Sequence, residues 1–244
     1  MTSTDVVGRP RVRACAAADK IELMADILAK LRDIYFHELG FQCTGVRDNC
    51  EQAFSFQPLD TGERTFIVMP ARLAVPIGGA LSAAANVKKL IDDKRKRNKQ
   101  FESEDAYRLR LARARMLQTE LDGLVLDEIL KLGVRNSLEH FDEFLDRENV
   151  RLQDISTPCV ALYNVGLSHE GNVVFDEGPL LDIRTYVAST KEFRNLGLSI
   201  NLGRLCAEAV AILSRLIENK RIPADGTTGV MSFVNFPEPP SPES

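Results

Sequence analysis

The run RNSLEH at residues 135–140 holds the side chains of this 244-residue chain that are best suited to chemistry. It ends in His140, one of three histidines in the chain, and an imidazole gains and loses a proton near neutral pH. Arg135 supplies a permanent positive charge with a planar set of donors, which suits a place where negative charge develops. The amide of Asn136 can orient a histidine or a bound oxygen by hydrogen bonding.

These residues belong to a distinct stripe of a predicted helix. At 100° per residue, Asn136, His140 and Phe144 recur at i, i+4 and i+8, away from the stripe that predicts the core. That core stripe consists of Val134, Leu138, Phe141 and Leu145. A large aromatic side chain aligned with two polar ones indicates that a partner chain or another helix covers this side.

A structural interpretation of the same residues stays open. Asn136 and His140 would then hydrogen-bond to a neighbouring helix, and Arg135 would pair with Glu139 or Asp142. In that case the motif would stabilise the fold without taking part in any reaction.

The run resembles the R-N-x-x-x-H signature of the HEPN superfamily (higher eukaryotes and prokaryotes nucleotide-binding). Members of that family include toxin ribonucleases, anticodon nucleases and RNA-targeting CRISPR effectors. The resemblance implies a bundle of four or five helices with the motif late in the bundle. It also implies metal-independent cleavage of single-stranded RNA, with no cofactor, in which the substrate's own 2′-hydroxyl is the nucleophile. A strand-like region at 159–189 departs from the minimal bundle.

Roles for individual residues follow from the resemblance. His140 would be the general acid or base, Arg135 would stabilise charge on the phosphorane, and Asn136 would position the histidine or a phosphate oxygen. Because family members often pair two motifs across a dimer, we expect a homodimer with Phe144 at the interface. No metal ligand is expected, since the helix carries no Glu-x-x-His pair.

Charge is distributed unevenly along the chain. Residues 88–115 carry a net charge of +6, whereas residues 119–149 carry −6. One interpretation is a pair of solvated helix faces that complement each other. The other is a basic ridge that follows a phosphate backbone, with Lys94, Arg95, Lys96 and Arg97 as the predicted RNA-binding residues.

Composition excludes several classes of protein. The chain is 44% hydrophobic and 27% charged, which is typical of a globular protein and excludes a wholly disordered one. A net charge of −4 argues against a protein that coats nucleic acid non-specifically. Five scattered cysteines indicate reduced thiols, and the first twenty residues lack a secretory apolar core. We therefore expect a cytoplasmic protein that does not insert in a membrane.

Hydrophobic periodicity predicts a mainly helical chain with a small antiparallel β insert before the last helix. Gly40 is expected to end the first helix, a loop with a short strand is expected over 41–64, and Pro76 should bend or interrupt the second helix. The expected helices span 17–39, 66–97, 104–121, 125–146 and 198–219. The expected strands lie within 159–168, 172–175 and 180–189.

This pattern predicts one helical-bundle domain at 15–220, with the β insert at about 157–190. Residues 1–14 are expected to be flexible, and the Pro-rich tail at 221–244 is expected to be disordered.

Two functional hypotheses of different class remain. The first is a HEPN-type endoribonuclease that acts as a toxin or defence protein and has a neutralising partner protein. The second is a non-catalytic helical module that binds RNA, a nucleotide or another protein.

Overall fold

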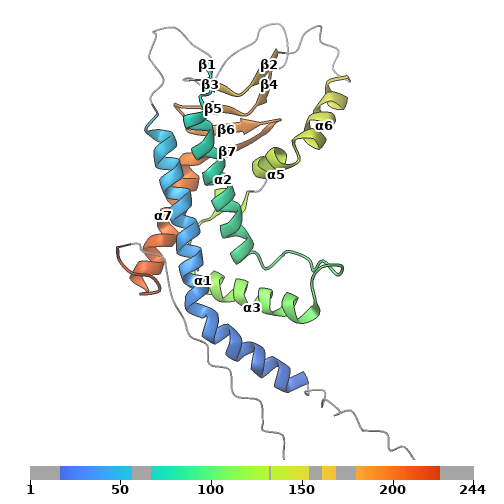
Figure 1. The fold of residues 1–244 in the computed structure, drawn as a ribbon. Helices are drawn as coiled ribbons and strands as arrows, with labels where there is room; N and C mark the ends of the chain where they lie inside the picture. Colours follow the sequence, from blue (N-terminus) through green and yellow to red (C-terminus); the bar gives the residue numbers. More distant parts are fainter. Residues whose placement is uncertain (1–16, 57–66, 132, 154–160, 169–179, 226–244) are drawn as a thin grey trace, which may run out of the picture.

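A computed structural model describes residues 17–56, 67–131, 133–153, 161–168 and 180–225. It is mainly helical, as predicted, with a small mixed sheet at one end. The long helices α1, α2 and α7 run side by side, and α3 lies across their lower end in Figure 1, away from the sheet. No helix in these segments is long and apolar enough to cross a membrane. The predicted flexible N-terminus at 1–14 and most of the predicted tail lie outside the described residues.

Helix α1 spans Ala17–Phe54 and is longer than predicted. The expectation that Gly40 ends it was wrong, and so was the loop expected after it. Gly40 is buried, and the buried positions continue past it at spacings of three and four. These positions are Phe36, Leu39, Cys43, Val46, Cys50 and Ala53. Small side chains and cysteines conceal this periodicity in the sequence because they carry a weaker hydrophobic signal than Leu or Ile.

Helix α2 spans Ala71–Ile91, shorter at both ends than predicted. Pro70 caps its start, which suits a residue with a fixed φ and no N–H to donate. Its buried face is rich in small residues, as the sequence indicates. At Gly79 the helix approaches α1 so closely that an added Cβ would lie 2.6 Å from the Oδ1 atom of Asn49.

Helix α3 spans Glu104–Glu120, in agreement with the sequence, and Ser103 caps its N-terminus. The single helix predicted over 125–146 was wrong. The structure has three shorter helices in this region, α4 (Asp127–Leu130), α5 (Gly133–Glu139) and α6 (Phe141–Gln153). Lys131 has an extended backbone after α4, and the carboxylate of Glu208 binds the first N–H groups of α4. The extended backbone at Lys131 interrupts a pattern that is helical throughout by periodicity alone, and Glu208 stabilises the start of α4.

The predicted β insert exists, but its topology and its end differ from the prediction. A five-stranded sheet has the order β1-β3-β5-β6-β7, and β2 pairs with β4. The pairs β2–β4 and β3–β5 are parallel, whereas β5, β6 and β7 form an antiparallel meander. The strands are β1 (Ile67–Val68), β2 (Ala161–Asn164), β3 (Gly166–Ser168), β4 (Leu180–Ile183), β5 (Thr185–Val187), β6 (Glu192–Asn195) and β7 (Leu198–Asn201). The strand expected at 172–175 lies outside the described residues.

Helix α7 spans Leu202–Glu218, because the first four residues of the predicted helix belong to β7. Its buried stripe packs against α1 and α4. The chain stays packed beyond the helix: Ile222 is buried, and Arg221 forms an ion pair with Glu120. The prediction of a disordered tail from residue 221 therefore placed the start of the tail too early.

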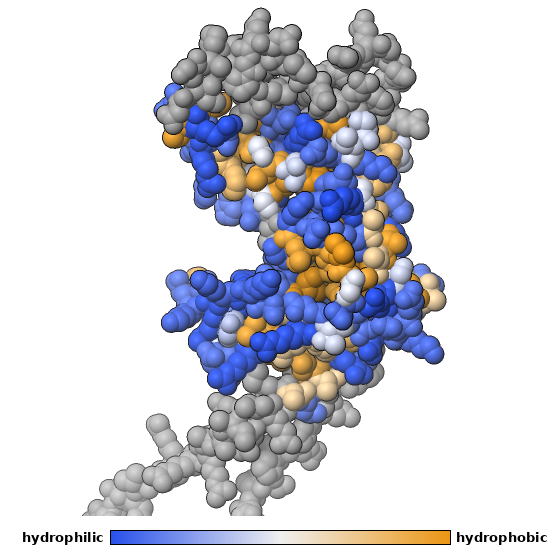
Figure 2. Space-filling view, turned by 180° about the vertical axis from the view of Figure 1, so that it is seen from behind, coloured by the Kyte–Doolittle hydropathy of each residue, from blue (hydrophilic) through white to orange (hydrophobic). Residues whose placement is uncertain are grey.

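The main core lies between the long helices and the sheet. It joins apolar side chains of α1, α2 and α7 to Leu167, Tyr186, Phe193 and Ile200 of the strands. From behind, the molecule has a hydrophilic projection at the level of α3, and a hollow separates this projection from the upper part (Figure 2). Helix α5 and the chain between α2 and α3 lie on the same side of α2 in Figure 1.

Candidate functional site

Helix α5, which carries the RNSLEH run as far as Glu139, is hydrogen-bonded to strand β6 by its buried face. Ser137 is fully buried and donates a hydrogen bond of 2.7 Å to the carbonyl of Val134. The Nδ2 atom of Asn195, on β6, donates to the Ser137 Oγ at 2.8 Å, and the Asn195 Oδ1 accepts from the backbone N–H of Arg184. The sheet therefore fixes how the helix is rotated about its axis.

This rotation directs Asn136 and His140 outward. Both residues are exposed, whereas Arg135 is partly buried at the flank of the helix. Asn136 and His140 are four residues apart, so they share one face of the helix. The backbone N–H of His140 donates to the carbonyl of Asn136 at 2.9 Å, which confirms helical spacing between them. Of the three predicted catalytic residues, the structure thus brings two together on an open surface.

Arg135 has a partner within its own helix. One of its terminal nitrogens forms an ion pair with the carboxylate of Glu139, as the structural interpretation of the sequence anticipates. Its Nε atom is buried and has no hydrogen-bond partner among the described residues. A bound phosphate would therefore share the guanidinium with Glu139.

His140 lies at the junction of α5 and α6. The carbonyl of His140 accepts from the backbone N–H of Phe144 at 3.1 Å, so helical hydrogen bonding continues through the junction. The His140 side chain is 58% exposed, and its Nδ1 atom lies 3.7 Å from a carboxylate oxygen of Glu143. The hydrogen bonds that the structural interpretation expects from Asn136 and His140 to a neighbouring helix are absent from the described part of the chain.

Phe144 is covered by its own chain. It is half-buried and packs with Phe141 on a second apolar cluster around Ile183 and Leu196 of the sheet region. The guanidinium of Arg147 stacks over its ring at 4.7 Å. The cover that the sequence predicts for this aromatic side chain is therefore at least partly intramolecular. Its assignment to a dimer interface stays a prediction.

The predicted RNA-binding residues lie in the extended chain between α2 and α3. Lys94, Arg95 and Lys96 are exposed. Arg97 is partly buried, and it donates to the carbonyl of Glu102 at 2.9 Å and pairs with Glu104 at 2.5 Å. The four basic residues thus differ in availability, since the Arg97 charge is already engaged.

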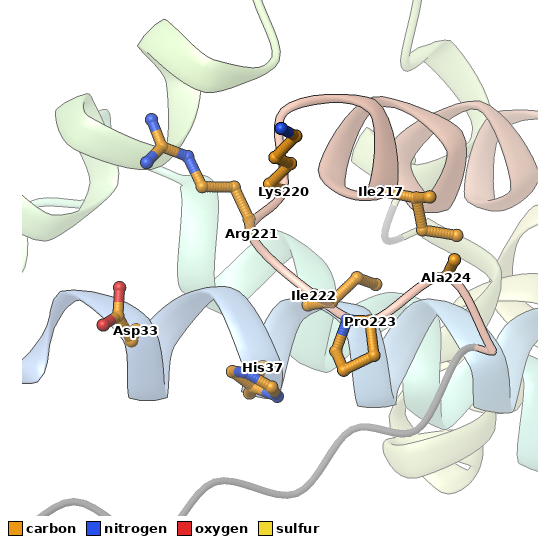
Figure 3. Close-up of a pocket in the computed structure, with 8 residues that line it drawn as sticks. All are labelled: Asp33, His37, Ile217, Lys220, Arg221, Ile222, Pro223 and Ala224. Atoms are coloured by element: carbon orange, nitrogen blue, oxygen red, sulfur yellow. The ribbon is translucent and has the colours of Figure 1, made fainter.

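An open pocket of about 680 Å³ lies between the middle of α1 and the chain that follows α7 (Figure 3). Its polar lining is formed by Asp33, His37, Lys220 and Arg221. The Nδ1 atom of His37 is buried and has no hydrogen-bond partner within the described residues. Sequence reasoning assigns His37 no role, and this pocket contains no residue of the 135–140 run.

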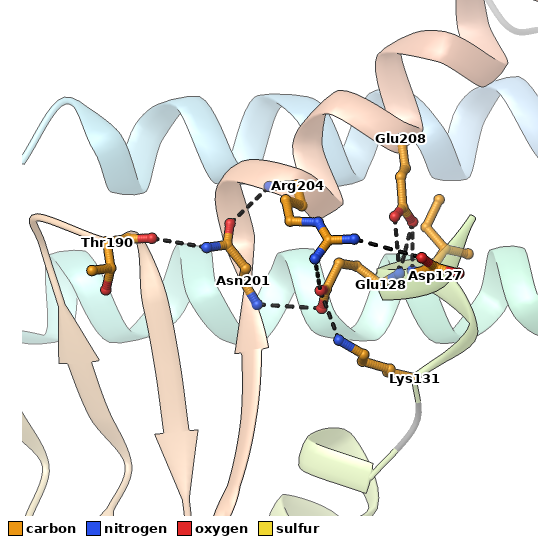
Figure 4. A network of polar contacts seen from close by, with 8 residues as sticks. Asp127, Glu128, Lys131, Thr190, Asn201, Arg204 and Glu208 are labelled. Carbon is orange, nitrogen blue, oxygen red and sulfur yellow. Dashed lines mark hydrogen bonds and ion pairs between the residues drawn. The ribbon is translucent and has the colours of Figure 1, made fainter. Parts of the chain in front are cut away.

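A buried carboxylate network joins α4 to α7, and it was not predicted from the sequence (Figure 4). Glu208 of α7 accepts from the backbone N–H groups of Glu128 and Ile129 at 2.9 to 3.0 Å. Glu128 is itself buried and pairs with Lys131 at 2.7 Å. The signal was present: Glu208 interrupts the apolar stripe of the last predicted helix. Because its contacts bind a helix N-terminus, we assign it to stability.

Among the described residues, no cluster of His, Cys, Asp and Glu has an arrangement that could hold a metal ion. Comparisons with family models, with curated proteins and with solved structures found no match to this chain.

Proposed function

We propose that this protein is a metal-independent endoribonuclease that cleaves single-stranded RNA, with His140, Arg135 and Asn136 as its catalytic residues. The observation that carries the proposal is the exposure of His140 and Asn136 on one face of a helix whose opposite face is bonded to the sheet. An exposed imidazole on an anchored helix can reach a bound substrate and keep a defined position.

In the proposed reaction, the 2′-hydroxyl of a ribose attacks the adjacent phosphorus. A base accepts the hydroxyl proton, and an acid gives a proton to the departing 5′-oxygen. The P–O bond to that oxygen breaks as the bond to the 2′-oxygen forms, so the products are a 2′,3′-cyclic phosphate and a 5′-hydroxyl. His140 fills one of the two proton-transfer roles, and Arg135 stabilises the negative phosphorane.

One chain supplies one His140, whereas the reaction needs both a base and an acid. A homodimer that juxtaposes two motifs would supply the second imidazole and a second arginine. We therefore propose a homodimer as the active form.

The decisive test is cleavage of a single-stranded RNA in the presence of EDTA. His140→Ala should lower the rate by about two to four orders of magnitude, the usual size of a general acid–base contribution. Asn149→Ala, at an exposed position of the following helix, is the matched control and should cleave like the unmodified protein. Both variants should keep the thermal unfolding midpoint, because neither side chain is buried.

Three outcomes would contradict the proposal. Folded protein that leaves RNA intact excludes the ribonuclease. Unfolding of His140→Ala assigns the residue to stability. A strict requirement for Mg²⁺ moves the chemistry to the carboxylates of α5 and α6.

A non-catalytic RNA-binding module is the second candidate. The ion pair between Arg135 and Glu139 favours it, because this pair already neutralises the one arginine of the motif. If the protein is such a module, we expect it to bind RNA without cleaving it. The His140→Ala variant should then bind RNA as tightly as the unmodified protein.

The proposed ribonuclease would act as a toxin or defence protein. Induced expression in a bacterial host should then arrest growth, His140→Ala should relieve the arrest, and a neutralising partner protein should suppress it.

A further inference from the structure

Phe101 is the most exposed large apolar residue that the structure describes, at 80%. It belongs to the segment Asp92–Ser103 between α2 and α3, which we call the basic arm. A single exposed apolar side chain needs no explanation by itself. Phe101 differs because Lys94, Lys96 and Lys99 lie within seven residues of it, in the same arm.

Hydrogen bonds hold the arm in a defined shape. The backbone N–H groups of Phe101 and Glu102 both donate to the carbonyl of Asn98, at 3.2 and 2.8 Å. Arg110 of α3 holds the arm against α3, because it donates hydrogen bonds to the carbonyl of Arg95 at 3.0 Å and to the Glu102 carboxylate at 2.8 Å. These hydrogen bonds hold the turn that keeps the Phe101 ring exposed to solvent.

The acidic side chains of the arm form contacts within the protein, whereas four of its five cationic side chains form no ion pair with the described residues. Asp92 accepts from the backbone N–H of Lys94, Asp93 accepts from Gln118, and Glu102 pairs with Arg110. In contrast, the ammonium groups of Lys94, Lys96 and Lys99 form no ion pair within the described segments, and neither does the guanidinium of Arg95; all four residues are exposed. The arm thus offers solvent four positive charges, three of them on lysines, and one aromatic face.

A single-stranded nucleic acid fits both features. Its phosphates attract the lysines, and every base has a π-face that can stack on an aromatic ring. An acidic peptide would use the lysines and leave the ring without a function. A membrane surface is less well matched, because interfacial binding uses an apolar helix face rather than one side chain.

We infer that the basic arm binds single-stranded RNA, with Phe101 as a stacking platform for one base and Lys94, Lys96 and Lys99 as contacts to flanking phosphates. The inference rests on the proposed function in taking RNA as the ligand. The arm and the α5–α6 junction lie on the same side of the molecule, with a hollow between the arm and the upper part (Figures 1 and 2). A strand bound on the arm would extend across this hollow toward the α5–α6 junction.

Binding is measured by fluorescence anisotropy with a labelled twelve-nucleotide oligouridylate and an abasic ribose-phosphate oligomer of equal length. All proteins carry His140→Ala, so that the oligouridylate stays intact. Phe101→Ala should weaken binding of the oligouridylate by about 5- to 150-fold, the range for loss of one stacked base, and leave abasic binding unchanged. Phe101→Trp should restore binding. Phe41→Ala, at an exposed phenylalanine of α1, is the control and should change neither.

Simultaneous replacement of Lys94, Lys96 and Lys99 by Gln should weaken the binding of both the oligouridylate and the abasic oligomer. It should also reduce the slope of log affinity against log salt concentration by about 2, as expected for three lost phosphate contacts to a single strand.

The inference is overturned if Phe101→Ala binds the oligouridylate as tightly as its parent, or if no variant binds RNA. It is also overturned if Phe101 governs binding to phosphatidylserine vesicles and has no effect on RNA. Failure of the proposed function alone would look different. Binding of the oligouridylate by the His140→Ala proteins would still depend on Phe101, and the protein with His140 intact would leave the oligouridylate uncleaved.

Discussion

The Nδ2 atom of Asn195 donates a hydrogen bond of 2.8 Å to the Oγ of Ser137, and both side chains are completely buried. This bond links strand β6 to the helix that carries the candidate site, across 58 residues of sequence. Since a helix can turn about its axis without losing its own hydrogen bonds, such a lateral bond decides which residues face solvent. Ser137 therefore positions Asn136 and His140 although it faces away from them.

Loss of this bond should affect stability and activity together. We expect Asn195→Ala to lower the free energy of unfolding by about 1–3 kcal/mol, because it leaves the Arg184 backbone N–H without its partner and removes the hydrogen bond that the buried Ser137 hydroxyl accepts. RNA cleavage should fall under conditions where the variant is still folded. Urea unfolding and a cleavage assay measure the two effects. Ser82→Ala, at an exposed position of α2, should change neither. Unaltered stability in Asn195→Ala would contradict the positioning role.

Removal of the carboxylate beside Arg135 should free its positive charge. Glu139→Gln keeps the size of the side chain and abolishes the ion pair. We expect this variant to bind single-stranded RNA several-fold more tightly, with little change in stability, because a partly exposed ion pair contributes about 0.2–1 kcal/mol. Anisotropy titration measures the affinity, and Glu218→Gln at the exposed end of α7 is the control. Weaker binding in Glu139→Gln would mean that the ion pair holds Arg135 in its binding conformation.

The junction between α3 and the end of α7 should make stability depend on pH. Burial alone would raise the pKa of Glu120, but hydrogen bonds from Arg221 and Asn219 outweigh it and hold that pKa below its ordinary value. A depressed carboxyl pKa stabilises the fold above the unfolded pKa of about 4.3, and the contribution disappears as the pH falls through the folded value. The stability gap between the unmodified protein and Glu120→Gln should therefore be largest near neutral pH and narrow below about pH 4. A gap that widens in acid would refute the assignment.

Phe144 should contribute to both self-association and folding. Its ring packs on the cluster around Ile183, so Phe144→Ala should lower the free energy of unfolding by about 1–3 kcal/mol, less than for a fully buried Phe. If the ring also lies at the proposed interface, sedimentation equilibrium should show weaker dimerisation for this variant. Val150→Ala, exposed on the same helix, is the control. An unmodified chain that sediments as a monomer at micromolar concentration would exclude the dimer.

Periodicity predicted the helices whose apolar stripe is complete. Helix α3 agrees with its predicted bounds nearly to the residue, since Ser103 caps its start and acidic residues occupy its first turn. The prediction failed at Gly40, where a glycine is buried within α1 and the buried face of the helix continues past it despite the low helix propensity of glycine. It also failed over 125–146, where the backbone is extended at Lys131, and where Glu208, a carboxylate 80 residues away, binds the backbone at the start of α4. A contact of that range leaves no periodic trace in the segment that it touches.

The candidate site, too, could be predicted only in part from the sequence. Exposure of Asn136 and His140 follows from their helical spacing, and the Arg135–Glu139 pair follows from theirs. The role of Ser137 could not be predicted, because a serine in a helix is compatible with either burial or exposure. The intramolecular cover of Phe144 depends on where the sheet lies, which the helix pattern does not specify.

The two groups that hold this region in place, Asn195 and Glu208, are both synthesised after it. A ribosome releases residues 135–140 into solution well before β6 and α7 exist, so the growing chain displays the motif before it can fix its orientation. Under the proposed ribonuclease activity, this order has a practical consequence. The nascent chain, tethered to its own messenger and surrounded by ribosomal RNA, would remain inactive until β6 and α7 have been synthesised.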